Sequence, residues 1–223
     1  MKLKSFTVSI ALWTMILGSC KKQDIRLTPL ASIQIINAVV GGSELQFGTN
    51  KATIPNNAYA AYGVLTGSQV LKLSSTVTPD LVYYNQTKNF VNGEVYSLFL
   101  TGTPTSVETV FFKEGNIPFH TNNVFGARVI NLVKDGVPIS VNLQGRANGS
   151  FIDNLGYKAI SAFKDVSSTA SEGDKVLEFR NATTGDLITS FTVPSWNIPR
   201  FRNITLVFAG TAGAEIIFRA TNY

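Results

Sequence analysis

The strongest constraint on the fold of this 223-residue chain is an internal repeat. Ser32–Val39 (SIQIINAV) resembles Gly126–Val133 (GARVINLV), and Tyr96–Gly102 (YSLFLTG) resembles Ile204–Gly210 (ITLVFAG). Self-similarity that recurs along a chain indicates that one structural unit occurs more than once. The sequence therefore predicts two copies of the same unit.

The spacing between the copies grows along the chain. Matched residues are 94 positions apart at the first segment and 106 to 108 apart later, where Glu108–Phe111 matches Glu215–Phe218. The second copy therefore carries an insertion of about a dozen residues. Its predicted place is the polar stretch Ser167–Asp174, where the first copy has only Thr66–Gln69, because small polar residues with glycine mark a solvated loop.

The matching segments are typical of β-strands. They are short, rich in Val, Ile, Leu, Phe, Tyr and Thr, and bounded by Gly, Asn, Pro and Ser, and no window keeps an apolar period of 3.6 residues. About seven short strands in each copy indicate a β-sandwich. We expect an all-β chain with one sandwich in residues 31–125 and a second in residues 126–223.

The N-terminus carries a different signal. Two lysines, Lys2 and Lys4, precede an apolar stretch from Phe6 to Leu17, and Gly18 and Ser19 then lead to Cys20, the only cysteine. The stretch is too short to span a bilayer, which needs roughly 20 apolar residues. This pattern is typical of a bacterial lipoprotein signal peptide.

Residues 1–19 are therefore expected to be removed and residues 20–30 to form a lipidated tether. Acyl chains such as palmitate would be attached at Cys20, and two or more chains hold a protein stably on a membrane. Lys21 follows the cysteine, and an aspartate there would have favoured retention in the inner membrane. We expect an outer-membrane anchor, with the face of the membrane left open.

Each copy opens with two strand motifs: Gln34–Ala38 and Arg128–Leu132 are the first, and Leu45–Gly48 and Ile139–Asn142 are the second. These motifs resemble the opening strand and, more loosely, the second strand of the family known as domain of unknown function 4397, which is common in Bacteroidota lipoproteins. The Ser-Pro-Asp-Ala-Pro loop frequent in the family is missing from both copies. The resemblance implies tandem immunoglobulin-like antiparallel β-sandwich domains, and it supplies no catalytic residue.

Composition argues against several kinds of function. Removing Lys2 and Lys4 from the 19 basic residues leaves 17 against 14 acidic residues, and no basic run exceeds two residues, so a nucleic-acid partner is not expected. His120 is the only histidine, and with no cysteine after Cys20 it cannot build a multi-histidine or thiolate metal site. We expect a packing role for His120, no metal, no cofactor and no catalytic residues.

One loop is a candidate ligand-binding site. Trp196 is the only tryptophan after the signal peptide, and Arg200 and Arg202 follow it in a proline-bounded segment. An indole beside guanidinium groups is suited to stacking on a sugar or to contact with an acidic partner. The alternative interpretation is that Trp196 covers one end of the second sandwich core.

These features predict a non-enzymatic envelope lipoprotein that acts as a binding, adhesion or scaffolding module. Its expected partners are membrane lipid through acylated Cys20 and a glycan or an envelope protein. The alternative interpretation is a pilin-like structural subunit of a surface appendage.

Overall fold

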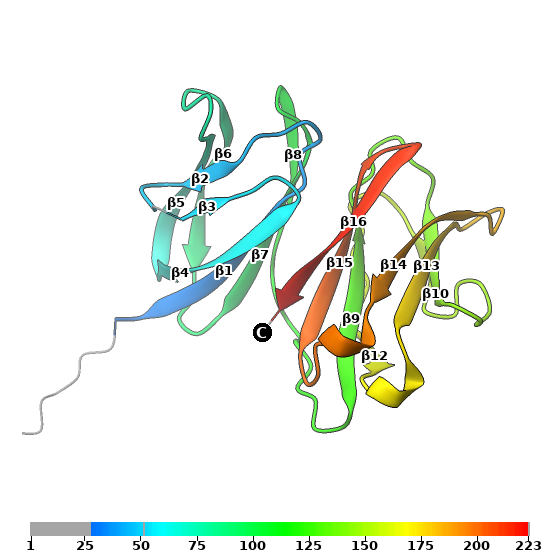
Figure 1. The fold of residues 1–223 in the computed structure, drawn as a ribbon. Coiled ribbons are helices and arrows are strands. Elements are labelled where there is room, and N and C mark those ends of the chain that lie inside the picture. Colours follow the sequence, from blue (N-terminus) through cyan, green and yellow to red (C-terminus); the bar gives the residue numbers. More distant parts are fainter. Residues whose placement is uncertain (1–27, 51, 223) are drawn as a thin grey trace, which may run out of the picture.

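The computed structural model describes residues 28–222 except residue 51, and this part of the chain is almost entirely β-structure (Figure 1). It contains sixteen strands in four sheets of four, with two short 3-10 turns in its second half. The predicted all-β class is confirmed.

The first eight strands form one sandwich. Its two sheets have the strand orders β4-β1-β7-β8 and β3-β2-β5-β6. Their inner faces enclose a core that includes Ile33, Ile35, Leu73 and Leu98. The strands are β1 Leu30–Asn37, β2 Leu45–Phe47, β3 Thr53–Ile54, β4 Ala58–Leu65, β5 Gly67–Ser75, β6 Val82–Phe90, β7 Val95–Thr103 and β8 Ser106–Lys113.

The last eight strands repeat this arrangement. Their sheets have the orders β12-β9-β15-β16 and β11-β10-β13-β14 around a core that includes Val129, Phe179 and Leu206. The elements are β9 Val124–Asn131, β10 Ile139–Leu143, β11 Ile152–Leu155, β12 Lys164–Ser167, η2 Ala170–Glu172, β13 Lys175–Asn181, β14 Leu187–Val193, η3 Ser195–Asn197, β15 Asn203–Thr211 and β16 Ala214–Asn222.

Each sandwich contains one parallel strand pair, which corrects the expectation of antiparallel pairing throughout. Strand β1 lies between β4, its antiparallel partner, and β7, its parallel partner, and β9 lies in the same way between β12 and β15. A parallel pair needs a long crossover connection, and here the strands between β1 and β7 supply it. An immunoglobulin constant domain instead places strands ABED in one sheet and CFG in the other.

The repeat places equivalent residues in equivalent contacts, as predicted. Asn37 ends β1 and donates to the carbonyl oxygen of Ile54, and Asn131 ends β9 and donates to the carbonyl oxygen of Leu155. These side-chain amides tie the first strand of each sandwich to the opposite sheet.

The insertion in the second copy is spread over several loops, which corrects the prediction of one extra loop at Ser167–Asp174. The offset between equivalent residues is already 101 at Ile54 and Leu155, before β12 begins. The offset reaches 106 in the next strand, where Leu73 lies opposite Phe47 and its equivalent Phe179 lies opposite Val141. Most of the insertion therefore lies between β10 and β11, and the stretch with η2 holds only part of it.

The match of Glu108 with Glu215 is wrong by one residue. Glycines Gly102 and Gly210 are equivalent, and they lie opposite Val107 and Glu215 respectively. Because side chains alternate between faces, a shift of one residue reverses which face a side chain occupies. The β7–β8 and β15–β16 turns are equally long, so the register is the same in both copies. Glu108 and Glu215, which were matched by identity, therefore lie on different faces of their sheets.

The two sandwiches share a third apolar core between them. Outward-facing residues of the β1/β7 sheet pack against outward-facing residues of the β9/β15 sheet, so both sheets are covered on both faces. Strands buried on both faces have nearly continuous apolar sequences, which explains the segments IQIINAVV and ARVINLV. This core consists of Ile36, Ala38, Phe99, Ile130, Leu132, Val207, Ala209 and Ala220.

Candidate functional site

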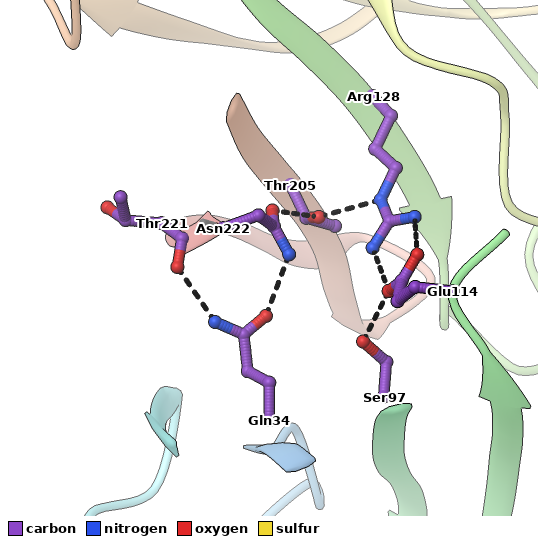
Figure 2. A network of polar contacts seen from close by, with 7 residues as sticks. All are labelled: Gln34, Ser97, Glu114, Arg128, Thr205, Thr221 and Asn222. Carbon is purple, nitrogen blue, oxygen red and sulfur yellow. Dashed lines mark hydrogen bonds and ion pairs between the residues drawn. The ribbon is translucent and has the colours of Figure 1, made fainter. Parts of the chain in front are cut away.

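A buried ion pair crosses the contact between the sandwiches (Figure 2). Glu114 follows β8 and Arg128 lies on β9, and the guanidinium donates through Nη1 and Nη2 to the two carboxylate oxygens at 2.8 and 2.6 Å. Arg128 also donates through Nε to the hydroxyl oxygen of Thr205 at 2.9 Å, and its guanidinium lies 4.4 Å from the ring centroid of Phe163. Ser97 donates to Glu114, so the carboxylate is fully engaged.

A neutral pair beside this ion pair mirrors it, and Thr205 contacts both. The Gln34 amide on β1 donates to the carbonyl oxygen of Thr221 at 2.8 Å and accepts a 2.9 Å hydrogen bond from Asn222. Asn222 in turn accepts from the hydroxyl of Thr205 at 2.7 Å. The side chains of Gln34, Thr205 and Asn222 are buried.

The two pairs are related by the repeat. Gln34 and Arg128 are equivalent residues of β1 and β9, and Glu114 and Asn222 stand at equivalent positions after Lys113 and Thr221. Each copy therefore presents the same patch to the other. Contacts of this self-complementary kind are those of a two-fold symmetric dimer, formed here within one chain.

A third interdomain contact is ionic and partly exposed. Glu108 on β8 accepts from Lys134 at 2.7 Å and from Lys158 of the second sandwich. Hydrogen bonds from the two ammonium groups lower the pKa of Glu108 to about 2. With the apolar core and the two buried pairs, this contact fixes the sandwiches as one body.

The predicted Trp196 loop lies at the surface. Trp196 is in η3 and its side chain is 83% exposed, so it does not cover the core of the second sandwich. Arg200 and Arg202 are exposed in the same loop. Within the described residues neither guanidinium forms an ion pair. The loop thus combines an exposed indole with two available cations.

Two further exposed aromatic side chains belong to this site: Phe201 within the same loop and Phe119 outside it, and neither was among the candidate residues expected from the sequence. Phe119, in the connection between the sandwiches, is 90% exposed, and Phe201 is 50% exposed. Phe201 donates its backbone N–H to Val124, and Asn203 donates its side-chain amide to the carbonyl oxygen of Pro118. These bonds hold the connection and the β14–β15 loop together.

The exposed aromatic residues lie at the end of the molecule where the described chain begins. Strands β1 and β7 run parallel, as do β9 and β15, and contacts from Gln34 to Thr221 and from Thr101 to Leu132 place the beginnings of all four at one end. Figure 1 shows β1 and β9 both rising from the lower side of the molecule. We call this the tether end. Its exposed apolar residues are Leu30, Leu65, Val91, Phe119, Trp196 and Phe201.

His120 has a structural position at this end. It is buried, and its Nε2 atom lies 2.8 Å from Oδ1 of Asn203 on β15. A Cβ atom on Gly126 would lie 2.8 Å from that Nε2, so only glycine fits there. His120 fixes the connection between the sandwiches against the second one and thereby positions Phe119.

A polar groove of about 330 Å³ lies beside η2, next to the Trp196 loop. Its lining includes Arg146, Glu172, Asp174 and Lys175. Lys175 is paired with Glu172 at 2.8 Å, and Asp174 accepts from the backbone N–H of Ser195. The first contact joins η2 to β13 and the second joins the segment after η2 to η3, so these three charged residues have structural roles.

Cys20 lies outside the described residues, so the predicted lipid attachment stays a prediction. In the described part of the chain there is no group of three or more His, Cys, Asp or Glu side chains suited to a metal ion. None of the helices in that part is long and apolar enough to cross a membrane.

The chain matches no protein-family model and no curated protein sequence. Among solved structures it is similar to the C-terminal domain of AlgF from P. aeruginosa, with 17% sequence identity and a TM-score of 0.30. The match covers 40% of this chain and all of that domain. We draw no conclusion from a match at this TM-score, and the resemblance to domain of unknown function 4397 stays a prediction.

Proposed function

We propose that this protein is a non-enzymatic lipoprotein of the bacterial outer membrane, anchored through acylated Cys20, whose two sandwiches form one rigid binding module. The N-terminal pattern of lysines, apolar residues and Gly18-Ser19-Cys20 supports the anchor. The binding surface is the tether end, where Trp196, Arg200 and Arg202 are exposed.

The observation that carries the proposal is the fixed position of this exposed surface. Phe119 comes from the connection between the sandwiches, and Trp196 and Phe201 come from the β14–β15 loop. Hydrogen bonds through Asn203 hold these segments together, and the Glu114–Arg128 pair holds the second sandwich against the first. A rigid surface binds with a smaller entropic cost than a flexible one.

The anchor is tested in cells that express the full chain. Metabolic labelling with a palmitate analogue is expected to label the wild-type protein and to fail with Cys20→Ser, because serine offers no thiol for acylation. The variant should also leave the membrane fraction. Labelling and fractionation that stay unchanged in Cys20→Ser would exclude a lipoprotein.

The binding module is tested with the chain from residue 20 onward carrying Cys20→Ser. We expect binding to envelope material that is lost with Trp196→Ala and kept with Val77→Ala, because Val77 is exposed at the opposite end. Filaments in electron micrographs of the purified protein would instead favour the pilin-like subunit.

A further inference from the structure

We propose that the tether end is a membrane-contact surface: Phe119, Trp196 and Phe201 insert into the interfacial region of the lipid leaflet that holds the acyl anchor. This inference rests on the proposed anchoring at Cys20 and names the partner of the proposed binding surface. The occupant is a lipid surface, with a glycan or an envelope protein as competing outcomes of the test.

The distribution of exposed apolar side chains points to this end. Phe119, Trp196 and Phe201 are the only exposed large aromatic residues in the described part of the chain, and all three lie at the tether end. Leu30, opposite Leu65 in the β1–β4 pair, adds exposed aliphatic surface on the first sandwich. Tryptophan with other aromatic residues is enriched where proteins meet the membrane–water interface.

The length of the tether limits how far this end can lie from the membrane. Leu30, where β1 begins, is ten positions after Cys20, so the tether spans at most about 36 Å even when fully extended. The beginnings of β9 and β15 lie at the same end of the same rigid body. An anchor at Cys20 therefore holds Phe119 and Phe201 within reach of the lipid.

Phe201 combines a strained backbone conformation with a half-exposed ring. Its φ angle is 58°, in the left-handed region that non-glycine residues adopt only at a cost. Backbone strain of this kind occurs preferentially at functional sites. The strained residue is held by its hydrogen bond to Val124, and its ring is half exposed.

The charges at this end are compatible with lipid headgroups. Arg200 and Arg202 are exposed without an ion pair among the described residues, whereas the carboxylates of Glu94 and Glu172 are neutralised by Lys113 and Lys175. Two carboxylates at this end are exposed: Asp165 beside His120, and Asp174, which accepts from the backbone N–H of Ser195. Basic residues beside inserted aromatic residues add electrostatic attraction to anionic lipid.

Trp196 itself is the reporter for the test, because it is the only tryptophan after the signal peptide. The acylated full-length product is reconstituted into vesicles of phosphatidylethanolamine and phosphatidylglycerol, with and without bromine-labelled acyl chains. We expect the Trp196 emission to shift to shorter wavelengths and to be quenched by the brominated lipid. The matched control is Trp196→Phe with Val77→Trp, which moves the indole to the opposite end and should show neither effect.

The outcomes separate this inference from the proposed function. If the protein is acylated and Trp196 is quenched no more than the control indole, membrane contact is wrong and the anchor stands. A blue shift produced by a soluble glycan or an envelope protein, with no response to lipid, would assign the surface to that partner instead. In the unacylated Cys20→Ser chain, replacing Phe119, Trp196 and Phe201 by alanine should reduce vesicle binding on the order of tenfold; unchanged binding would also overturn the inference.

Discussion

The guanidinium of Arg128 faces the carboxylate of Glu114 in a two-pronged ion pair that joins the two sandwiches, with both side chains buried. The equivalent residues in the other copy of each position, Gln34 and Asn222, form a neutral amide pair beside it. Equivalent positions of one chain thus hold a charged pair and an uncharged pair. The uncharged pair is therefore the natural reference for measuring how much the buried charges contribute to the free energy of unfolding.

Arg128→Gln alone should strongly destabilise the protein, because it leaves the Glu114 carboxylate buried without its cation. Breaking one partner of a buried pair costs about 3–5 kcal/mol, measured here as the loss of unfolding free energy in urea. Arg128→Gln with Glu114→Asn copies the Gln34–Asn222 pair and should recover most of that loss. A double variant as unstable as the single one would show that the charge itself is required.

The Glu108 contact predicts a dependence of stability on acid. Hydrogen bonds from Lys134 and Lys158 lower the pKa of Glu108 from 4.5 to about 2 in the folded protein. A depressed carboxylate pKa stabilises the fold above the unfolded value and loses that effect as the pH falls towards the folded value. The difference in urea midpoint between wild type and Glu108→Gln should therefore be present at pH 6 and shrink between pH 4.5 and 2. A difference that grows on acidification would contradict this assignment.

Two glycines of the first sandwich that share a positive φ angle, Gly102 near the end of β7 and Gly67 at the start of β5, separate backbone strain from steric overlap. Gly102 has a φ of 83°, and a Cβ atom there would overlap the carbonyl oxygen of Ser106. Gly67 has a φ of 85° with open space around it. Gly67→Ala should cost about 1–2 kcal/mol from the left-handed backbone alone, and Gly102→Ala about 3 kcal/mol or more because overpacking adds to it. Equal losses in thermal unfolding would exclude the steric part.

Most of the fold was predictable, because strand composition and the repeat both survive divergence between the copies. The equivalence of Asn37 and Asn131 followed from their identity in the matching segments of the two copies. The register of β16 could not be predicted in this way, because Glu108 and Glu215 match in sequence but lie on different faces of their sheets. Alternating strands tolerate such shifts in an alignment, and only hydrogen bonding to the neighbouring strand fixes the register.

The packing of the two sandwiches left a signal in the sequence that the strand assignment did not use. Ile35-Ile36 and Val129-Ile130 are consecutive apolar residues in strands whose two faces would otherwise alternate. Such runs indicate burial on both faces, and here the second face is the other sandwich. The Glu114–Arg128 pair left no comparable signal, because two opposite charges 14 residues apart fit a surface pair equally well.

The Trp196 loop supplies the last prediction. An apolar residue in a loop is compatible with burial or exposure, so the sequence left both interpretations open, and the structure excludes burial in the core. Trp196→Ala should therefore leave the thermal midpoint nearly unchanged, since surface substitutions usually alter stability by less than about 0.5 kcal/mol.

Phe99→Ala provides the matched contrast for that measurement. Phe99 is fully buried in the core between the sandwiches, and truncating a buried phenylalanine costs about 3–5 kcal/mol. The thermal midpoint of Phe99→Ala should fall sharply. Trp196→Ala should instead keep its thermal midpoint and lose membrane contact. A Trp196→Ala variant that melts as early as Phe99→Ala would mean that the indole supports the fold after all. In that case the loss of vesicle binding would follow from unfolding and would no longer identify a contact surface.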